Sequence, residues 1–314
     1  MGVANLAAHD AVKAREALNR DGFVIVEGLL DRSTVADLKA RVDAMLAYER
    51  EHPFDPGDGP ALPGDEKFCN EYGPFVADAA ESERVRRRIR ADRAREFDTP
   101  WPVPPEEVCI SFFHLPTVFD GGRSQRVFNL INKDAAFAPL IEHPAILDIV
   151  DAELGRDAVL LDVSINNVGA RTDSGGWHLD SPISQMPEPL PDFTLAIQTV
   201  WMLDDFHAAN GATHVARGSN HTRRQPPKGQ AGLDNEVVLE GPAGSLAIWL
   251  SQTWHRHGGN STDRARTGMI VQYGRAWIKP FVDLRTPLTA EFAATLSPRL
   301  RYMMGCNANA PVRG

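Results

Sequence analysis

Cysteine, long apolar runs and excess basic charge are all scarce in this chain of 314 residues. The 3 cysteines (Cys69, Cys109 and Cys306) form no CxxC pair, which excludes a disulfide framework and a zinc site of the CxxC type. No apolar segment approaches the roughly 18 residues that a membrane-spanning helix needs. Charged residues interrupt the opening MGVANLAAHDAVKARE, where a signal peptide is apolar. We therefore expect a soluble protein of the reducing cytoplasm, with no membrane partner.

Basic residues are outnumbered by acidic ones. The chain has 33 Lys and Arg against 42 Asp and Glu, which gives a formal net charge of -9. This balance argues against a nucleic-acid partner, which calls for a broad basic face. One basic cluster, residues 84–95, is interrupted by Asp92 and is typical of a solvated helix face, although a place beside an anionic substrate stays open. We expect a small-molecule substrate, and the sequence indicates no oligomeric state.

Helical patterns dominate the first half of the chain. Apolar residues recur at helical spacing over residues 34–48 and again over about 136–154, which predicts two helices. The apolar run 23–26 follows Asp21-Gly22 and predicts a short buried strand. Proline and glycine are too dense in residues 51–65 for either element, so this segment is predicted to be a loop.

Short β-prone runs separated by turn residues follow from about residue 158. We predict strands over these runs: 159–163, 194–203, 212–216, 236–239, 245–250 and 267–277. Several short strands with no helix between them favour a sandwich or barrel over a doubly wound sheet. The predicted fold is therefore a mainly β core with flanking helices.

Candidate metal ligands concentrate in this β half, where six of the 10 histidines lie. His178 and Asp180 stand at positions i and i+2, which share one face of a strand. His255 follows after several predicted strands and supplies a second imidazole. Two histidines and one carboxylate form the facial triad typical of non-haem Fe(II) oxygenases, which leaves coordination positions open. On its own, however, the His-x-Asp pair favours a surface histidine beside an aspartate.

Taken in order, these motifs resemble the phytanoyl-CoA dioxygenase family of 2-oxoglutarate-dependent oxygenases. The resemblance spans about residues 16–277 and rests on these segments: residues 21–30, 129–133, 143–144, 154–155, 178–180, 201–205, 210–213, 217–221 and 255–266. The chain departs from the family at Arg217, where the family has proline, and at Asn220, an extra residue before His221.

The resemblance implies a double-stranded β-helix, the cupin-like jelly roll, supported by N-terminal helices. It further implies a single oxygenase domain over residues 1–314. In this division, residues 1–156 are mostly helical support and active-site loops, residues 157–277 are the β-helix core, and residues 278–314 are a C-terminal extension. Residues 51–65 and 181–192 are candidate lids, because binding residues often lie on loops.

Roles carry over residue by residue. His178 and Asp180 match the family's paired metal ligands and His255 matches the distal one, which makes these three the expected catalytic and metal-binding residues. His257 competes with His255, since it shares the same strand face; the spacing from His255 to Arg266 fits the family better. Arg266 matches the arginine that holds the distal carboxylate of 2-oxoglutarate, a role that suits a permanently charged, bidentate donor.

Four further positions are expected at the cofactor site: Arg126, Thr213, Gln198 and Asn166. The first three are expected to contact the cosubstrate, and Asn166 could also face the substrate or metal-bound water. For each, a purely structural hydrogen bond is the open alternative. The implied cofactors are Fe(II), 2-oxoglutarate as cosubstrate, and O2.

The expected reaction is oxidation of an unactivated C–H of a small organic substrate, with release of succinate and CO2. Related halogenases carry Gly or Ala in place of the carboxylate ligand, so Asp180 favours hydroxylation, with desaturation or cyclisation also open. Natural-product scaffolds, amino acids and acyl-CoA thioesters all remain candidate substrates, and the net charge of -9 disfavours the last. The alternative function is a non-oxygenase cupin-type metal-binding protein, or a lyase or isomerase.

Overall fold

A computed structural model describes residues 5–7, 11–51, 118–120, 122–180, 182–280, 282, 284–285 and 288–306. The loop predicted over residues 51–65 (apart from Glu51), the basic cluster 84–95, Cys69 and Cys109 lie outside these residues. Among the residues described, no helix combines the length and the apolar character needed to cross a membrane.

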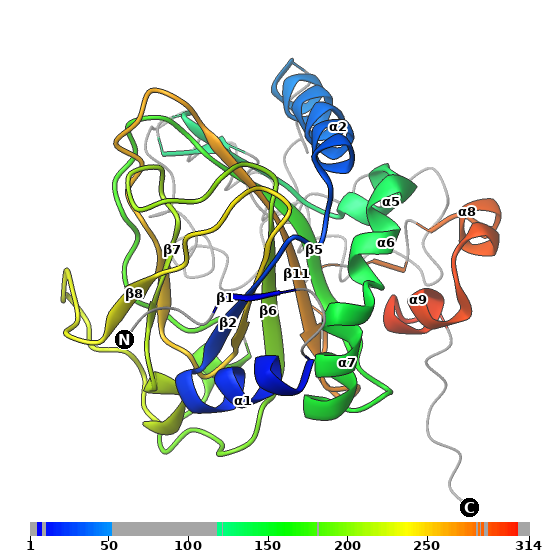
Figure 1. Cartoon of the computed structure of the whole chain (residues 1–314). Helices are drawn as coiled ribbons and strands as arrows, with labels where there is room; N and C mark the ends of the chain where they lie inside the picture. The colour runs from blue at the N-terminus through cyan, green and yellow to red at the C-terminus, as the bar shows by residue number, and fades with distance from the viewer. Residues whose placement is uncertain are drawn as a thin grey trace, which may run out of the picture.

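An eight-stranded sheet and a three-stranded sheet form the core (Figure 1). The larger sheet has the order β1-β2-β9-β6-β11-β5-β4-β3 and the smaller has the order β10-β7-β8. The strands are β1 (Asn5–Ala7), β2 (Phe23–Glu27), β3 (Val118–Phe119), β4 (Ser124–Val127), β5 (Val159–Val168), β6 (Ala196–Met202), β7 (Thr213–Ala216), β8 (Glu236–Val238), β9 (Leu246–Leu250), β10 (His255–His257) and β11 (Arg266–Gly274). Apart from the parallel β1–β2 pair, every pairing between these strands is antiparallel.

The segment before His178 extends the smaller sheet. Thr172 bridges Asn260 and His178 bridges His255, and the Gly175 N–H donates to the His257 carbonyl at 3.1 Å. Two sheets of about four central strands each, joined by long crossovers, form a jelly roll. The predicted double-stranded β-helix is therefore what the chain adopts.

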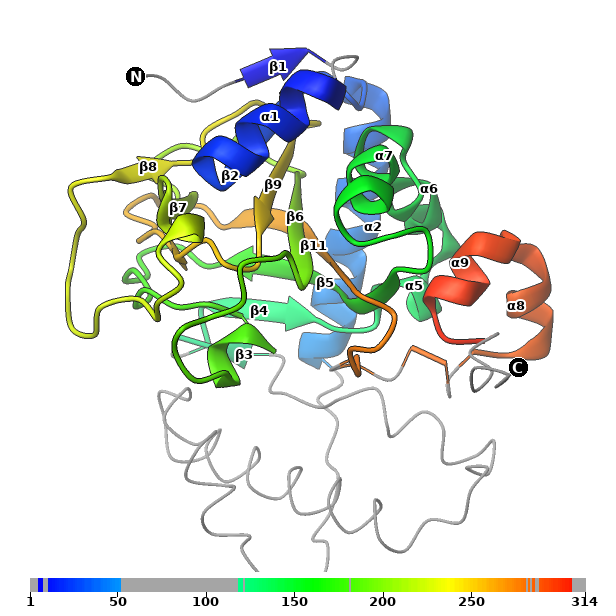
Figure 2. The ribbon, with the colours of Figure 1, turned by 90° about the horizontal axis from the view of Figure 1, so that it is seen from below.

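Helices cover one face of the larger sheet, and the smaller sheet covers the other (Figures 1 and 2). The helical elements are α1 (Ala11–Asp21), α2 (Arg32–Glu51), α5 (Leu130–Lys133), η3 (Ala135–Phe137), α6 (Ala138–Ile141), α7 (Pro144–Glu153), η4 (Ile183–Gln185), η5 (Ser219–His221), α8 (Ala290–Thr295) and α9 (Pro298–Met303). One apolar cluster joins α1, α2, α5–α7 and α9 to the outward side chains of the sheet, such as Val163, Trp201 and Val271.

The prediction of one continuous helix over 136–154 is wrong, because the helix is interrupted between α6 and α7. Pro144 lacks an N–H and pushes the preceding residue out of the helical conformation. His143 accordingly has an extended backbone (φ -62°, ψ 129°). Its Nδ1 accepts a hydrogen bond from the Ala145 N–H, so His143 caps a new helix that has proline in its first turn.

The inward faces of the two sheets divide into an apolar and a polar part. An apolar cluster from β2, β6, β9, β7 and the loops beside them fills one part, and it contains Phe23, Val200, Phe206, Val215 and Trp249. On β5, Asp162, Ser164 and Asn166 alternate with Val163 and Ile165, which pack against the helices. Because side chains alternate along a strand, these three polar residues face inward, toward the smaller sheet.

Candidate metal centre

Two backbone hydrogen bonds bring the two histidine-bearing segments together. The His178 N–H donates to the His255 carbonyl at 2.9 Å, and the His255 N–H donates back to the His178 carbonyl at 3.1 Å. Side chains directly opposite each other in an antiparallel pair lie on the same face, and the two imidazole rings are 4.4 Å apart between centroids. The pairing register therefore places both rings side by side.

Asp180 completes the group. One ligand atom from each of His178, Asp180 and His255 lies within 4.8 Å of the others. The His255 Nε2 is 3.1 Å from one carboxylate oxygen of Asp180, and the His178 Nε2 is 3.8 Å from the other. Asp180 lies outside any regular strand, so the turn of the chain after His178, rather than a continuous strand, aims both side chains at one point.

The other imidazole nitrogen of each histidine is tied to the backbone. Nδ1 of His178 lies 2.9 Å from the Gly176 carbonyl, and Nδ1 of His255 lies 3.0 Å from the Thr253 carbonyl. A carbonyl only accepts, so each Nδ1 carries the proton and donates it. This assignment turns the Nε2 atom of both rings toward Asp180, the usual orientation of a metal-binding histidine.

Burial and the mutual contacts of the three residues shift their pKa values in different directions. Burial, and then the neighbouring His255, lower the pKa of His178. Burial opposes ionisation of Asp180, but His255, His178 and the Gln198 amide outweigh it and hold the pKa of this carboxyl below its ordinary value. Burial also opposes the charged form of His255, whereas the Asp180 carboxylate raises the pKa of this imidazole. The group thus contains an ionised carboxylate beside imidazoles whose Nε2 atoms face it.

Arg266 is buried at the start of β11 and keeps its charge. Burial lowers the pKa of this guanidinium to about 10, while Asp204 opposes the shift, so the side chain is cationic at neutral pH. One terminal nitrogen donates to the Gly211 carbonyl, and the guanidinium carbon lies 4.2 Å from the centre of the Phe206 ring. Its Nε has no hydrogen-bond partner within the described structure, an arrangement that suits an additional anionic acceptor.

The other predicted contact residues also lie on inward faces. The Gln198 amide N–H donates to Asp180. Arg126 donates to Asp162 and Ser164 and lies opposite Asn166 in the β4–β5 pair. Thr213 shares its face of β7 with the inward-facing Val215, because the two stand at positions i and i+2.

His257 lies beside the group without joining it. In the β10–β7 pair it stands opposite Thr213, so it does share the inward face with His255. The ligand atoms that gather within 4.8 Å come from His178, Asp180 and His255 and, in the part of the chain that is described, do not include His257. Its ring instead packs on Gly175, where a Cβ atom would lie 2.6 Å from the imidazole.

Three inward residues of the larger sheet were not among the predicted site residues: Asp162, Ser164 and Gln272. The strand prediction ended at residue 163 because polar residues follow it, whereas β5 continues to Val168. A polar residue at every second position of 162–166 is the sequence signal that identifies an inward polar face.

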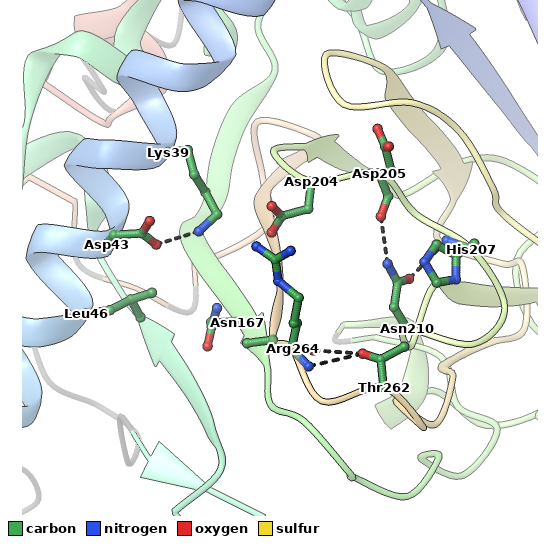
Figure 3. A pocket seen from close by; sticks show the side chains of 11 residues that line it. Lys39, Asp43, Leu46, Asn167, Asp204, Asp205, His207, Asn210, Thr262 and Arg264 are labelled. Carbon is green, nitrogen blue, oxygen red and sulfur yellow. Dashed lines mark hydrogen bonds and ion pairs between the residues drawn. The ribbon is translucent and has the colours of Figure 1, made fainter.

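A cavity of about 680 Å³ lies at the helix-covered face of the larger sheet, the face away from the histidine–aspartate group (Figure 3). It is bounded by α2 and by the loops that flank β6 and β11 and is lined by Lys39, Asp43, Leu46, Asn167, Asp204, Asp205, His207, Asn210, Thr262, Arg264 and Ala265. Three of its charged side chains already have partners within the protein: Lys39 pairs with Asp43 at 2.5 Å, and Asp204 accepts from the Thr267 N–H at 2.8 Å. No residue of the histidine–aspartate group lines this cavity.

A jelly roll that gathers two histidines and a carboxylate between its sheets defines the class of cupin-like metal-binding proteins. The family model of phytanoyl-CoA dioxygenase matches residues 18–268. The chain therefore belongs to the phytanoyl-CoA dioxygenase family, and the resemblance noted in the sequence is confirmed.

Three individual relatives share 26–28% identity with part of this chain. "Dioxygenase af480" of Aspergillus fumigatus is 28% identical over 180 residues, 57% of this chain and 58% of the relative. "Uncharacterized protein Rv1501" of Mycobacterium tuberculosis is 28% identical over 189 residues, 56% of this chain and 65% of the relative. The chain thus spans less than two thirds of the length of these two relatives. "Dioxygenase FrzG" of Cladobotryum sp is 26% identical over 219 residues, 62% of this chain and 69% of the relative.

A solved structure supports the fold. The crystal structure of SnoN, described as a non-heme alpha ketoglutarate dependent epimerase from nogalamycin biosynthesis, superposes with a TM-score of 0.52 at 16% identity. The match covers 85% of this chain and 83% of that one. At this identity the likeness establishes the shared jelly-roll architecture.

Proposed function

We propose that this protein is an Fe(II)- and 2-oxoglutarate-dependent dioxygenase that oxidises an unactivated C–H of a small organic substrate, by hydroxylation, with release of succinate and CO2. The observation that carries the proposal is the convergence of His178, Asp180 and His255 within 4.8 Å. Both imidazoles turn Nε2 inward because their Nδ1 atoms are bonded to carbonyls. Nitrogen and carboxylate donors in a two-to-one ratio suit ferrous iron with coordination positions left open.

The residues also fit 2-oxoglutarate. Arg266 offers a buried cation with an unpartnered Nε, which suits the distal carboxylate of the cosubstrate. Such a charge-assisted contact contributes about 1.5–3 kcal/mol. Thr213, Asn166, Gln198 and Arg126 remain predicted contacts, supported by their places on the inward faces of the sheets.

In the reaction, the protein's own residues bind the cofactors, orient the metal ligands and exclude water. When bound, iron and 2-oxoglutarate together supply the oxidation of the C–H by O2. His178, Asp180 and His255 would hold the iron, and Gln198 fixes the carboxylate of Asp180 by donating to it. The apolar cluster around Trp249, whose ring lies 5.3 Å from that of His255, excludes water from one side. The presence of Asp180 favours hydroxylation over halogenation, since related halogenases lack this carboxylate.

Anaerobic addition of 2-oxoglutarate to the Fe(II)-loaded protein tests the proposal. We expect a visible charge-transfer absorption band from iron chelated by the cosubstrate, together with succinate release in air. His255→Ala removes metal binding and the band, whereas His257→Ala retains metal binding. Absence of the band in a protein that binds zinc or manganese tightly contradicts the proposal and favours the non-oxygenase alternative.

We also propose that residues 1–314 act as one oxygenase domain in the cytoplasm. Helices and sheet share one apolar cluster, which supports a single domain. The scarcity of cysteine supports the location, because disulfides are rare in reducing compartments.

A further inference from the structure

A row of polar side chains crosses the inward face of the larger sheet. Gln198 on β6 stands opposite Gln272 on β11, and Gln272 stands opposite Asp162 on β5. All three side chains are buried. Gln198 donates to Asp180 at one end of this row, and Arg126 donates to Asp162 at the other, at 2.6 Å. The row therefore begins beside a ligand of the candidate metal centre, and Asp162 lies about 10 Å from Gln198, since neighbouring strands are about 4.8 Å apart.

Only one of the two carboxylate oxygens of Asp162 has a hydrogen-bond partner among the described residues. Its Oδ2 accepts from Arg126 and, at 2.8 Å, from the Ser164 hydroxyl. Its Oδ1 has no partner in the described part of the structure, although Asp162 is 2% exposed. Buried polar atoms are almost always hydrogen-bonded, and those that are not call for an explanation such as a ligand.

The unpartnered atoms of the row are acceptors. Gln198 turns its N–H toward the carboxylate of Asp180, which fixes the orientation of the amide, because a carboxylate requires a donor. Its Oε1 is consequently an acceptor, and within the described residues it has no partner. Two unpartnered oxygens, one of them from a carboxylate, disfavour an anionic group and favour a molecule that donates hydrogen bonds.

Arg126 does not change this preference. Its Nη2 donates to Asp162 and its Nε and Nη2 donate to Ser164, so the guanidinium neutralises the carboxylate that it contacts. The Arg126–Asp162 pair therefore adds little net charge to the site, while Oδ1 of Asp162 remains available as a directional acceptor.

We propose that Asp162, held by Arg126 and Ser164, is the substrate-recognition residue of this enzyme and binds a hydroxyl or amine of a neutral or cationic small molecule. The inference rests on the proposed oxygenase function and names the substrate class of the same site. It places Arg126 on the substrate's side of the site, in contrast to the predicted contact with 2-oxoglutarate. It disfavours a carboxylate- or phosphate-bearing group at this position.

Matched ligands test the inference. A set of small ring scaffolds, each available as primary alcohol, primary amine and carboxylate, is titrated into the protein loaded with Zn(II) and 2-oxoglutarate and followed by ligand-observed NMR. We expect alcohols or amines to bind at least about tenfold more tightly than the matching carboxylates, the effect of one hydrogen bond to a charged group. The comparison of alcohol with amine tells whether the recognised group is neutral or cationic.

Comparing Asp162→Asn with the control Asp263→Asn tests whether Asp162 is the residue that causes the preference for alcohols or amines over carboxylates. Asp263 lies on the surface, with its side chain 82% exposed, so its variant keeps the preference of the wild type. Asp162→Asn reduces the preference to about threefold or less, because the amide has one acceptor in place of two. Thermal unfolding of both variants verifies that they fold.

The outcomes separate this inference from the proposed function. If the wild type binds 2-oxoglutarate and shows the charge-transfer band, but no scaffold prefers alcohol or amine, or none binds at all, the assignment of Asp162 is wrong and the oxygenase proposal stands. A preference that survives in Asp162→Asn also overturns the assignment. If the band is absent from the wild type, the proposed function itself fails.

Discussion

The carboxylate of Asp180 is held from three directions. The Nε2 of His255 lies 3.1 Å from one oxygen, the Nε2 of His178 lies 3.8 Å from the other, and Gln198 donates from β6. Partners outside the ligand set orient a ligand and tune its affinity for the metal. Gln198 is therefore expected to act on the metal through Asp180.

Replacing Gln198 by Leu removes this hydrogen bond while nearly conserving side-chain volume. We expect the affinity for Mn(II) or Fe(II), measured by anaerobic calorimetry, to fall by about 10- to 100-fold. Gln230→Leu, on an exposed loop, serves as the control with unchanged affinity. Equal affinities for the wild type and Gln198→Leu would show that the hydrogen bond does not orient the carboxylate.

Arg266 and Arg264 allow a similar comparison. Arg266 is 3% exposed, whereas Arg264 is exposed. Lysine keeps the charge but loses the planar, bidentate geometry. We expect Arg266→Lys to raise the dissociation constant of 2-oxoglutarate by about 10- to 100-fold, with little change in melting temperature, and Arg264→Lys to leave it unchanged. An unaltered dissociation constant in Arg266→Lys would remove this arginine from the cosubstrate site.

Among the elements, α2 shows how a local sequence signal sets a boundary. Asp31 precedes the helix, and its Oδ1 accepts from the Thr34 N–H at 2.7 Å and from the Ser33 hydroxyl at 2.6 Å. These bonds lower the pKa of Asp31 from 3.8 to about 2, with the Ser33 hydroxyl as the largest cause. An aspartate in this position satisfies a free N–H of the first turn.

Asp31→Ala is expected to lower the melting temperature in a pH-dependent manner. Because the folded-state pKa is depressed, the ionised carboxylate stabilises the folded protein fully above the unfolded value of 3.8, and this contribution is lost as the pH falls toward about 2. Thermal unfolding of wild type and variant at a series of pH values measures the difference. A difference that stays constant from pH 7 into this acidic range would contradict the assignment of the cap.

The strands illustrate both the strength and the limit of local patterns. The six predicted β-prone runs all overlap observed strands, since apolar and β-branched residues are enriched where strands are buried. β10 was not among the six β-prone runs, because His255-Arg256-His257 has no apolar residue. β5 was predicted too short, because its inward face after Val163 is polar.

At the scale of the molecule, the described helices and the larger sheet share one apolar cluster. The Tyr273 hydroxyl donates to the Ile141 carbonyl at 2.7 Å and joins β11 to the end of α6. At the C-terminal side, Leu300 and Met303 of α9 are buried in the same apolar cluster. The described part of the segment after residue 277 therefore contributes to the stability of this cluster.

Leu300→Ala tests this coupling. Leu300 is 0% exposed, and truncating a buried leucine to alanine costs about 2–5 kcal/mol. We expect a lower free energy of unfolding in a single transition, with metal affinity unchanged. Val12→Ala, at a position that is 68% exposed, is the control, with a change within about 0.5 kcal/mol. Two separate transitions in Leu300→Ala would contradict the single-domain proposal.

The sequence by itself determined a mainly β core from local periodicity. Its motifs, in a fixed order, determined the family, and the resemblance to that family implied the jelly roll and the candidate ligands. The tertiary structure decided what depends on the register between distant strands. The pairing of His178 with His255 brings that imidazole, rather than His257, into the ligand group. The stacking of β5, β11 and β6 aligns Asp162 with Gln198. Side chains that meet across a sheet are separated by tens of residues along the chain, so their contacts follow from the folded register and from no local pattern.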